Sequence, residues 1–140
     1  MKDDRKLTIG KLANVSGVGV ETVRFYERQG LIQRPPKGEG SFRCYPEVEA
    51  KKIRFIKKAQ ELGFTLKEIK ELLELQISEQ ATCGNITQRA EVKLSEVEAK
   101  IKDLQSMRRS LIKLVDSCGD KNISIKQCRV LDCFDPGWKC

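Results

Sequence analysis

The chain of 140 residues contains no histidine, no Cys-x-x-Cys pair and no long apolar run. The missing histidine removes the commonest nitrogen ligand of metal sites and a frequent catalytic base. Without a Cys-x-x-Cys pair, a thiol oxidoreductase or a metal-scavenging carrier is disfavoured. No apolar stretch approaches the ~20 residues that a transmembrane helix needs. These absences predict that the protein is neither an enzyme nor a membrane protein.

Six cysteines are present, and their meaning depends on the compartment. The first ten residues, MKDDRKLTIG, include two acidic residues where a signal peptide would have a basic and then an apolar segment. We therefore expect a cytoplasmic protein, in which thiols more often serve metal or redox chemistry than structural disulfides.

The positive charge is confined to the first half of the sequence. Residues 1–70 contain 16 Lys and Arg against 9 Asp and Glu, whereas residues 71–140 contain 11 of each. The whole net charge of +7 therefore belongs to the first half. This asymmetry indicates a polyanionic partner for that half alone.

Residues 7–30 predict two short helices around a glycine-containing turn, which is the helix-turn-helix pattern. Thr8 is a plausible N-cap, and the second helix is expected to stop at Gly30. Residues 31–46, LIQRPPKGEGSFRCYP, predict a basic hairpin in which the arms LIQR and SFRCY flank a Pro- and Gly-rich turn. A hairpin directly after a helix-turn-helix is the winged-helix arrangement.

Two further helices are expected before residue 76. The first starts with Pro46 in its first turn, ends at Gly63 and buries a stripe that includes Ile53 and Ile56. The second begins with Thr65 and Glu68 in capping-box spacing. The remaining inward positions predicted for the two helices are Val48, Ala59, Leu62, Leu66, Ile69, Leu72 and Leu73.

Residues 83–118 predict one long helix, because they contain no proline and no glycine after Gly84. Apolar or small side chains recur there in alternating steps of four and three, interrupted at Arg108. Five heptads of this kind are typical of a coiled coil, and the helix should pair with its copy in a second subunit. The positions in this seam are 83, 87, 90, 94, 97, 101, 104, 111, 115 and 118.

Cys83 and Cys118 both occupy the seam and are separated by five heptads, or about 52 Å of helix. They cannot meet within one chain, but an antiparallel dimer brings Cys83 of one subunit beside Cys118 of the other, twice. Cys128 could then complete a three-thiolate site for a soft ion such as Hg(II), Cd(II), Pb(II), Cu(I) or Zn(II). Alternatively, the two seam cysteines are only small apolar residues, or Cys118 and Cys128 form a disulfide.

The order and spacing of these motifs resemble the MerR family of metal-responsive transcription regulators across residues 6–132. The resemblance rests on LTIGKLA, VETVRFYERQGL, GSFRCY, RFIKKAQELGFTLKEIKELL and KLSEVEAKIKDLQSMRRSL, together with Cys83, Cys118 and Cys128. It implies a mainly α fold with a winged helix-turn-helix domain at 1–75, a linker and antiparallel coiled-coil dimerisation helix at 76–117 and a metal-binding loop and tail at 118–140.

The resemblance implies a homodimer on a near-palindromic operator that represses without metal and, with metal, distorts the promoter for RNA polymerase. The second helix of the helix-turn-helix would enter the major groove, and the wing would grip phosphates. The residues expected to contact DNA are Lys11, Thr22, Arg24, Tyr26, Lys37, Arg43, Tyr45, Lys57 and Lys58.

The chain is most similar to the mercuric-ion regulators, so Hg(II) held by Cys83 of one subunit and Cys118 and Cys128 of the other is the leading expectation. Pb(II), Cd(II) and Zn(II) are the alternatives, as is a thiol-based redox regulator. Copper(I) regulators of this family lack the seam cysteine, so the presence of Cys83 disfavours copper(I). Zinc regulators of the family use a histidine ligand, so the absence of histidine disfavours zinc. The interval from Cys118 to Cys128 is one residue longer than the resemblance leads us to expect. Cys44, Cys133 and Cys140 lie outside the pattern, and we expect Cys44 to be structural.

Overall fold

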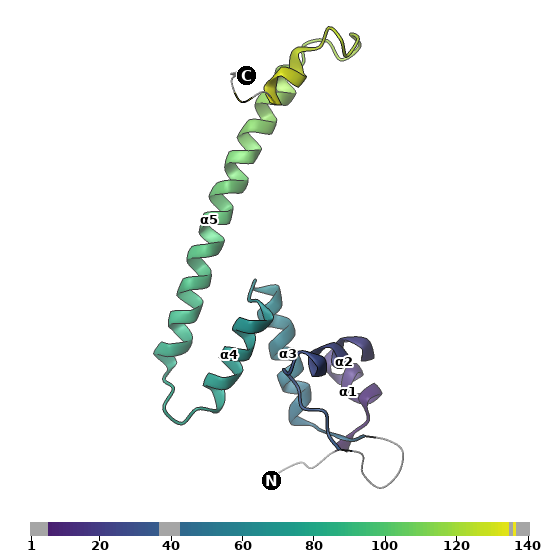
Figure 1. The fold of residues 1–140 in the computed structure, drawn as a ribbon, viewed down its shortest axis with the longest axis vertical. Helices are drawn as coiled ribbons and strands as arrows, with labels where there is room; N and C mark the ends of the chain where they lie inside the picture. The colour runs from purple at the N-terminus through teal and green to yellow at the C-terminus, as the bar shows by residue number, and fades with distance from the viewer. Residues whose placement is uncertain (1–5, 37–42, 135, 137–140) are drawn as a thin grey trace. The chain divides into compact units, whose positions relative to one another are not determined.

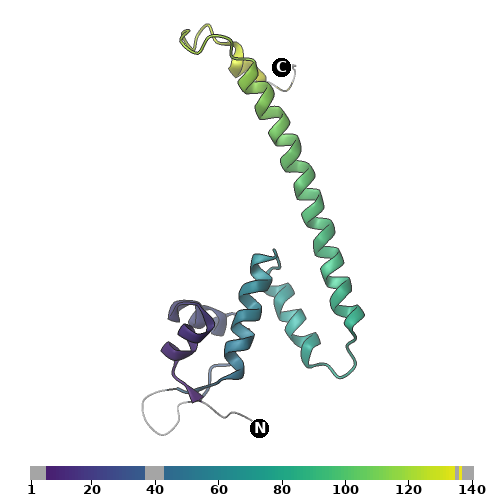
Figure 2. The same ribbon diagram turned by 180° about the vertical axis from the view of Figure 1, so that it is seen from behind.

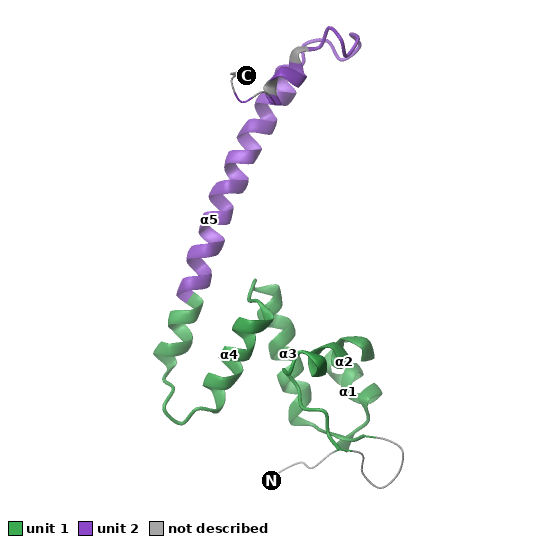
Figure 3. Ribbon diagram, in the orientation of Figure 1, with its two compact units in different colours: residues 1–90 green, residues 91–140 purple. Residues whose placement is uncertain are grey.

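The computed structural model describes residues 6–36, 43–134 and 136. The chain divides into two compact units, residues 1–90 and residues 91–140 (Figure 3). The border falls inside the long helix, between Ala90 and Glu91. The mainly α fold that the sequence predicts is confirmed (Figure 1), and its elements follow in chain order. They are β1 (Lys6–Leu7), α1 (Ile9–Ser16), α2 (Val20–Arg28), β2 (Tyr45–Pro46), α3 (Val48–Glu61), α4 (Leu66–Ile77), α5 (Cys83–Asp116) and the 3-10 helix η1 (Arg129–Phe134).

The helix-turn-helix forms where the sequence predicts it. Thr8 caps α1, because its hydroxyl accepts a hydrogen bond from the Lys11 amide at 3.3 Å. Gly17 then ends α1 with a φ of 72°, a left-handed conformation that a side chain would disfavour. The amide of Val18 closes the turn by donating to the Ala13 carbonyl at 3.0 Å. A tight turn of this kind lets α2 pack directly against α1.

The predicted pairing of the wing arms is wrong in the part of the chain that is described. β2 pairs antiparallel with β1, with Leu7 opposite Tyr45, and not with the LIQR segment. Leu31 and Ile32 of that segment are instead buried in the core, each 3% exposed. Their apolar side chains therefore anchor the segment to the helices, and residues 37–42 lie outside the described part. Pro46 belongs to β2, so α3 starts two residues after it.

The core of the first unit joins α1, α2, α3 and α4. Ile53 and Ile56 of α3 are fully buried and Ile69 of α4 packs in the same cluster. Two positions predicted to face inward, Val48 and Leu62, are exposed by 65% and 55%. They lie in the first turn of α3 and at its C-cap.

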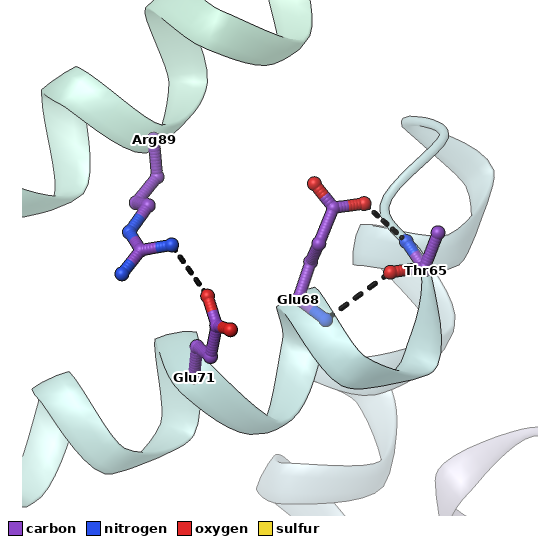
Figure 4. Close-up of polar contacts among 4 residues, drawn as sticks. All are labelled: Thr65, Glu68, Glu71 and Arg89. Atoms are coloured by element: carbon purple, nitrogen blue, oxygen red, sulfur yellow. Dashed lines mark hydrogen bonds and ion pairs between the residues drawn. The ribbon is translucent and has the colours of Figure 1, made fainter.

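The junction of α3 and α4 confirms a second local prediction. Gly63 takes a φ of 92° after α3, and the amide of Phe64 donates to the Ala59 carbonyl at 3.1 Å. Thr65 and Glu68 then form the expected capping box (Figure 4). The Glu68 amide donates to the Thr65 hydroxyl at 3.2 Å, and the Thr65 amide donates to the Glu68 carboxylate at 2.9 Å. These bonds satisfy amides at the start of α4 that have no partner within the helix.

α5 is one uninterrupted helix of 34 residues (Figure 2). Its apolar seam is exposed in the single chain, and Leu104 and Val115 reach 61% and 66% exposure. A row of apolar side chains this long is unfavourable in water unless another surface covers it. The other large seam residues that are exposed are Leu94, Val97, Ile101 and Leu111. Among the described residues, no helix is long and apolar enough to cross a membrane.

Candidate DNA interface and metal centre

α2 presents polar side chains on one face and core side chains on the other. Val23 is completely buried, whereas Arg24 is exposed and Thr22 is half-buried. Arg24 lies 3.7 Å from the Glu21 carboxylate, but both side chains are well exposed, so this ion pair is weak. The arginine is therefore available to a partner at little cost.

Two tyrosines that the sequence places against DNA belong to the core, and this corrects their expected orientation. Tyr26 is 3% exposed, and its hydroxyl donates to the Gln60 side chain of α3 at 2.8 Å. Tyr45 is 2% exposed, and its hydroxyl donates to the Glu27 carboxylate. The rings fill space between α2 and the elements that follow it, so their first role is packing.

Charged side chains surround the hydroxyl of Tyr45 and shift its pKa. Burial, followed by the hydrogen bond and the charge of Glu27, raises the pKa of Tyr45 to about 12. The positive charges of Arg43 and Arg34 act in the opposite direction, lowering that pKa. Both guanidinium groups therefore lie close enough to the phenol for their charges to influence it. Tyr45 remains a protonated hydrogen-bond donor across the physiological range.

A cavity of about 470 Å³ lies between α2 and the side chains of Arg34, Arg43 and Tyr45. Arg24 and Arg43, both predicted as DNA contacts, line it together with two arginines that the sequence analysis omitted, Arg28 and Arg34. A signal for Arg28 was available, since it lies four residues after Arg24 and so shares its face of α2. The remaining lining residues are Ile9, Glu27 and Tyr45.

The lysines predicted to contact phosphates have different environments. Lys57 of α3 donates to the Gly17 carbonyl at 3.0 Å and so stabilises the C-terminal end of α1. Lys58 forms an exposed pair with Glu61 at 3.7 Å. Lys11 is exposed, and Lys37 lies outside the described residues. Lys57 therefore contacts another helix of the unit, whereas Lys11 and Lys58 are surface cations; contact of the three lysines with DNA stays a prediction.

The three predicted metal ligands occupy the ends of the long helix and the loop after it. Cys83 is the first residue of α5 and is exposed. Cys118 follows the end of α5 and is half-buried, with its Sγ 3.9 Å from the Asp120 carbonyl. Cys128 is half-buried and immediately precedes η1. Within the described part of one chain, no three Cys, Asp or Glu side chains are close enough to hold a metal ion.

Of the three cysteines outside the predicted metal site, Cys44 is the one whose side chain the structure describes. Cys44 is exposed beside Tyr45, and its expected structural role stays a prediction. The side chain of Cys133 and the whole of Cys140 lie outside the described residues.

Cys83 borders an apolar groove of about 500 Å³ formed by α3, α4 and the first turns of α5. Phe55 of α3, Leu62 at the C-cap of α3 and Leu72 of α4 contribute to its walls. Two turns beyond Cys83, Arg89 forms an ion pair with Glu71 of α4 (Figure 4). The start of α5 is therefore linked to α4 by an ion pair, and both helices line the same apolar groove.

The helix-turn-helix, the small sheet and the long exposed helix define a winged-helix DNA-binding regulator. Residues 7–76 match the family model described as MerR HTH family regulatory protein, and residues 50–114 match the model described as MerR, DNA binding. The chain belongs to the MerR family of transcription regulators, whose members are not enzymes.

Named relatives extend this similarity over most of the chain. The HTH-type transcriptional regulator ZntR of Escherichia coli K12 is 39% identical over 130 residues, which cover 92% of each chain. The mercuric resistance operon regulatory protein of Serratia marcescens is 45% identical over 117 residues, covering 84% of this chain and 80% of that protein. The crystal structure of PbrR691 from Ralstonia metallidurans CH34 in complex with lead(II) has a TM-score of 0.80 and 33% identity, covering 90% and 97% of the two chains.

Proposed function

We propose that the protein is a metal-responsive transcription regulator with Hg(II) as its effector. It acts in the cytoplasm as a homodimer, binds a palindromic operator, represses without metal and activates a heavy-metal resistance operon when metal binds. The observation that carries the proposal is that Cys83 begins α5 and Cys118 follows its end, so that the exposed apolar seam of α5 lies between them.

The exposed seam supports a dimer. Side chains such as Leu104 and Leu111, each more than half exposed, need a second apolar surface, and an identical helix offers a matching row. In the antiparallel arrangement, Cys83 from one subunit meets Cys118 and Cys128 from the other at both ends of the pair. Each site then combines thiolates of two subunits, which fits the lack of a three-ligand cluster in the described part of a single chain.

Sulfur ligands favour the ion that we propose. Three thiolates with no nitrogen ligand suit thiophilic ions, and Hg(II) is the most thiophilic divalent candidate. The relative from Serratia marcescens, a mercuric resistance operon regulatory protein, supports this choice. The similarity to the lead(II) complex of PbrR691 makes Pb(II) the second candidate. Cd(II) and Zn(II) remain weaker alternatives.

The contacts at the start of α5 suggest how metal binding reaches the DNA-binding unit. Cys83 borders the groove made with α3 and α4, and Arg89 is paired with Glu71 of α4. A pull on Cys83 by thiolates of the partner would therefore act directly on α4. Movement of α4 would then shift the helix-turn-helix on the operator and change the DNA shape that RNA polymerase encounters.

A competition titration tests the proposal. The reduced protein is titrated with Hg(II), Pb(II), Cd(II) and Zn(II) against excess small thiol, and Hg(II) is expected to be retained most tightly. Cys83→Ser, Cys118→Ser and Cys128→Ser should each weaken binding, whereas the matched control Cys44→Ser should not. An unchanged mercury response in Cys83→Ser would contradict the proposed site. If Pb(II) is retained more tightly than Hg(II), the proposed mechanism still holds, but Pb(II) is the effector.

A further inference from the structure

The seam of α5 contains one charged residue, Arg108, in a row that is otherwise apolar or small. We propose that Arg108 of each subunit forms an ion pair with the partner subunit's Glu91, and that the two symmetric pairs hold the helices antiparallel in the register that the metal sites require. The inference rests on the proposed function, since it requires a homodimer. It adds Arg108 and Glu91 as positioning residues for Cys83 and Cys118.

The structure places Arg108 on the apolar face of α5. Its side chain lines a hollow of about 420 Å³ together with Leu104, Leu111 and Val115 of the seam. These three apolar side chains are each more than half exposed in the single chain, so a second helix that covers the seam also covers the hollow and the arginine. A guanidinium group covered by apolar side chains costs free energy unless a carboxylate or another acceptor meets it.

The helix that carries Arg108 offers no carboxylate to it. Side chains three and four positions away are neighbours on a helix, and around Arg108 they are two leucines, a glutamine and an isoleucine. In the described part of one chain, neither Arg108 nor Glu91 takes part in an ion pair. The counter-charge of Arg108 must therefore come from solvent or from a second subunit.

The register of the proposed metal site brings Glu91 beside Arg108. When Cys83 lies opposite the partner subunit's Cys118, position 108 is level with position 93 of the partner. Glu91 is two residues from that level, or ~3 Å along the helix. Glu91 lies four residues after seam position 87, and Arg108 lies three heptads after it, so both occupy one side of the seam. A two-fold axis perpendicular to the helices sets that side of one helix against the same side of the other.

The lysine at the level of Arg108 does not oppose this pairing. Lys93 is 8% exposed, and its ammonium group lies 2.6 Å from the Glu96 carboxylate of the same helix, so its charge is compensated within its own chain. Glu91 and Arg108 are both exposed in the single chain and can reach a partner. In a parallel dimer, Arg108 would instead face its own copy, and the like charges would repel. The arginine therefore opposes the parallel alignment and, with Glu91, favours the antiparallel one.

Charge reversal tests the pair without requiring that each variant form a stable dimer alone. Arg108→Glu and Glu91→Arg each place two like-charged pairs in their own antiparallel homodimer, whereas their heterodimer restores attraction at both positions. Subunits are mixed and re-annealed, one of them carrying a short tag, and native mass spectrometry separates the three dimers. If reversing one pair changes the dimer affinity about threefold, about nine-tenths of the dimers should be mixed, against about one half for random pairing.

The double variant, Arg108→Glu with Glu91→Arg, reports on the orientation of the helices. Its own antiparallel homodimer has both pairs restored, but its heterodimer with wild type has like charges at both, so only about one tenth of the dimers should be mixed. A parallel pair would give an excess of mixed dimers, because the reversed charge at position 108 would then face Arg108. Lys102→Glu reverses a charge on α5 outside the seam, and this matched control should pair randomly with wild type.

Retention of Hg(II) against excess thiol shows whether the pair supports the metal sites. The Arg108→Glu homodimer, with two reversed pairs, should dissociate about tenfold more readily than wild type. At subunit concentrations where it dissociates, Arg108→Glu should lose Hg(II) that wild type and the double variant retain. Equal loss from the double variant and from Arg108→Glu would contradict the role of the pair in positioning the thiols.

The outcomes separate failure of the inference from failure of the proposed function. Random pairing in both mixtures, with an intact wild-type dimer, would overturn the ion pair and leave the proposed metal regulator standing. An excess of mixed dimers between the double variant and wild type would show parallel helices, which contradicts both the pair and the shared metal site. If wild type is a monomer, the proposed homodimer fails, and the ion pair fails with it.

Discussion

Arg89 of α5 and Glu71 of α4 form an ion pair that joins the first turns of the long helix to α4 (Figure 4). The side chains are 49% and 34% exposed, so the pair should stabilise the fold by only ~0.2–1 kcal/mol. The pair lies near the apolar groove that Cys83 borders. We therefore expect its main effect to be on the coupling between metal binding at Cys83 and distortion of the DNA.

We therefore expect Arg89→Gln and Glu71→Gln to leave Hg(II) affinity nearly unchanged while reducing the metal-dependent increase in transcription. The coupling of two sites is typically about 1–3 kcal/mol, so losing part of it should be measurable as a several-fold smaller induction ratio. In vitro transcription with and without Hg(II) measures this ratio. The exchanged pair, Arg89→Glu with Glu71→Arg, should recover part of the induction. If the exchanged pair behaves no better than the single variants, the ion pair does not provide the coupling.

Tyr26 gives a direct test of a corrected expectation. Because its ring is buried and its hydroxyl donates to Gln60 at 2.8 Å, Tyr26→Phe should lower the free energy of unfolding by about 0.5–1.5 kcal/mol. Affinity for operator DNA should change little in the folded variant. Denaturant unfolding and DNA titration measure the two effects separately. A large loss of DNA affinity without a loss of stability would show that the Tyr26 hydroxyl contacts DNA.

The capping box at the start of α4 predicts the consequence of a third substitution. Thr65→Ala removes the hydroxyl that accepts the Glu68 amide, and the free energy of unfolding should fall by about 0.5–2 kcal/mol. Thr65→Ser keeps an acceptor oxygen and serves as the matched control, with a much smaller loss. Equal losses in the two variants would show that the methyl group of Thr65, and not its hydroxyl, stabilises this end of the helix.

Features encoded locally could be predicted from the sequence. The N-cap at Thr8, the capping box at Thr65 and the long helix from Cys83 each depend on side chains within a few residues or on a repeating heptad. The spacing of Cys83 and Cys118 follows from the helix repeat in the same way. Such signals require no knowledge of the distant chain.

Features that depend on distant parts of the chain were missed. The pairing of β1 with β2 joins residues almost forty positions apart, and Lys57 contacts Gly17 across 40 positions. In α2, the adjacent aromatic residues Phe25 and Tyr26 made the inward face ambiguous. The packing of α3 resolves that ambiguity, because the Tyr26 hydroxyl reaches Gln60 while Phe25 is only half-buried.

The raised tyrosine pKa values predict loss of stability in alkaline solution. Burial raises the pKa of Tyr26 and of Tyr45, the latter to about 12, from an ordinary value of 10.0. Between about pH 10 and 12 the unfolded chain loses phenolic protons that the folded chain retains, so the free energy of unfolding falls as pH rises. The chain has only two tyrosines, and absorbance near 295 nm should therefore follow both ionisations. Tyr45→Phe should remove the later one, whereas two ordinary titrations near pH 10 would contradict the burial argument.

The central claim is that each metal site combines Cys83 of one subunit with Cys118 and Cys128 of the other. Subunits carrying Cys83→Ser are mixed and re-annealed with subunits carrying both Cys118→Ser and Cys128→Ser, and Hg(II) retention against excess thiol is measured. Neither parent should retain Hg(II), but a mixed antiparallel dimer contains one complete set of three thiols. Random one-to-one mixing should then restore about one quarter of the wild-type capacity. No recovery on mixing, or tight retention by the Cys83→Ser parent alone, would contradict a site shared between subunits.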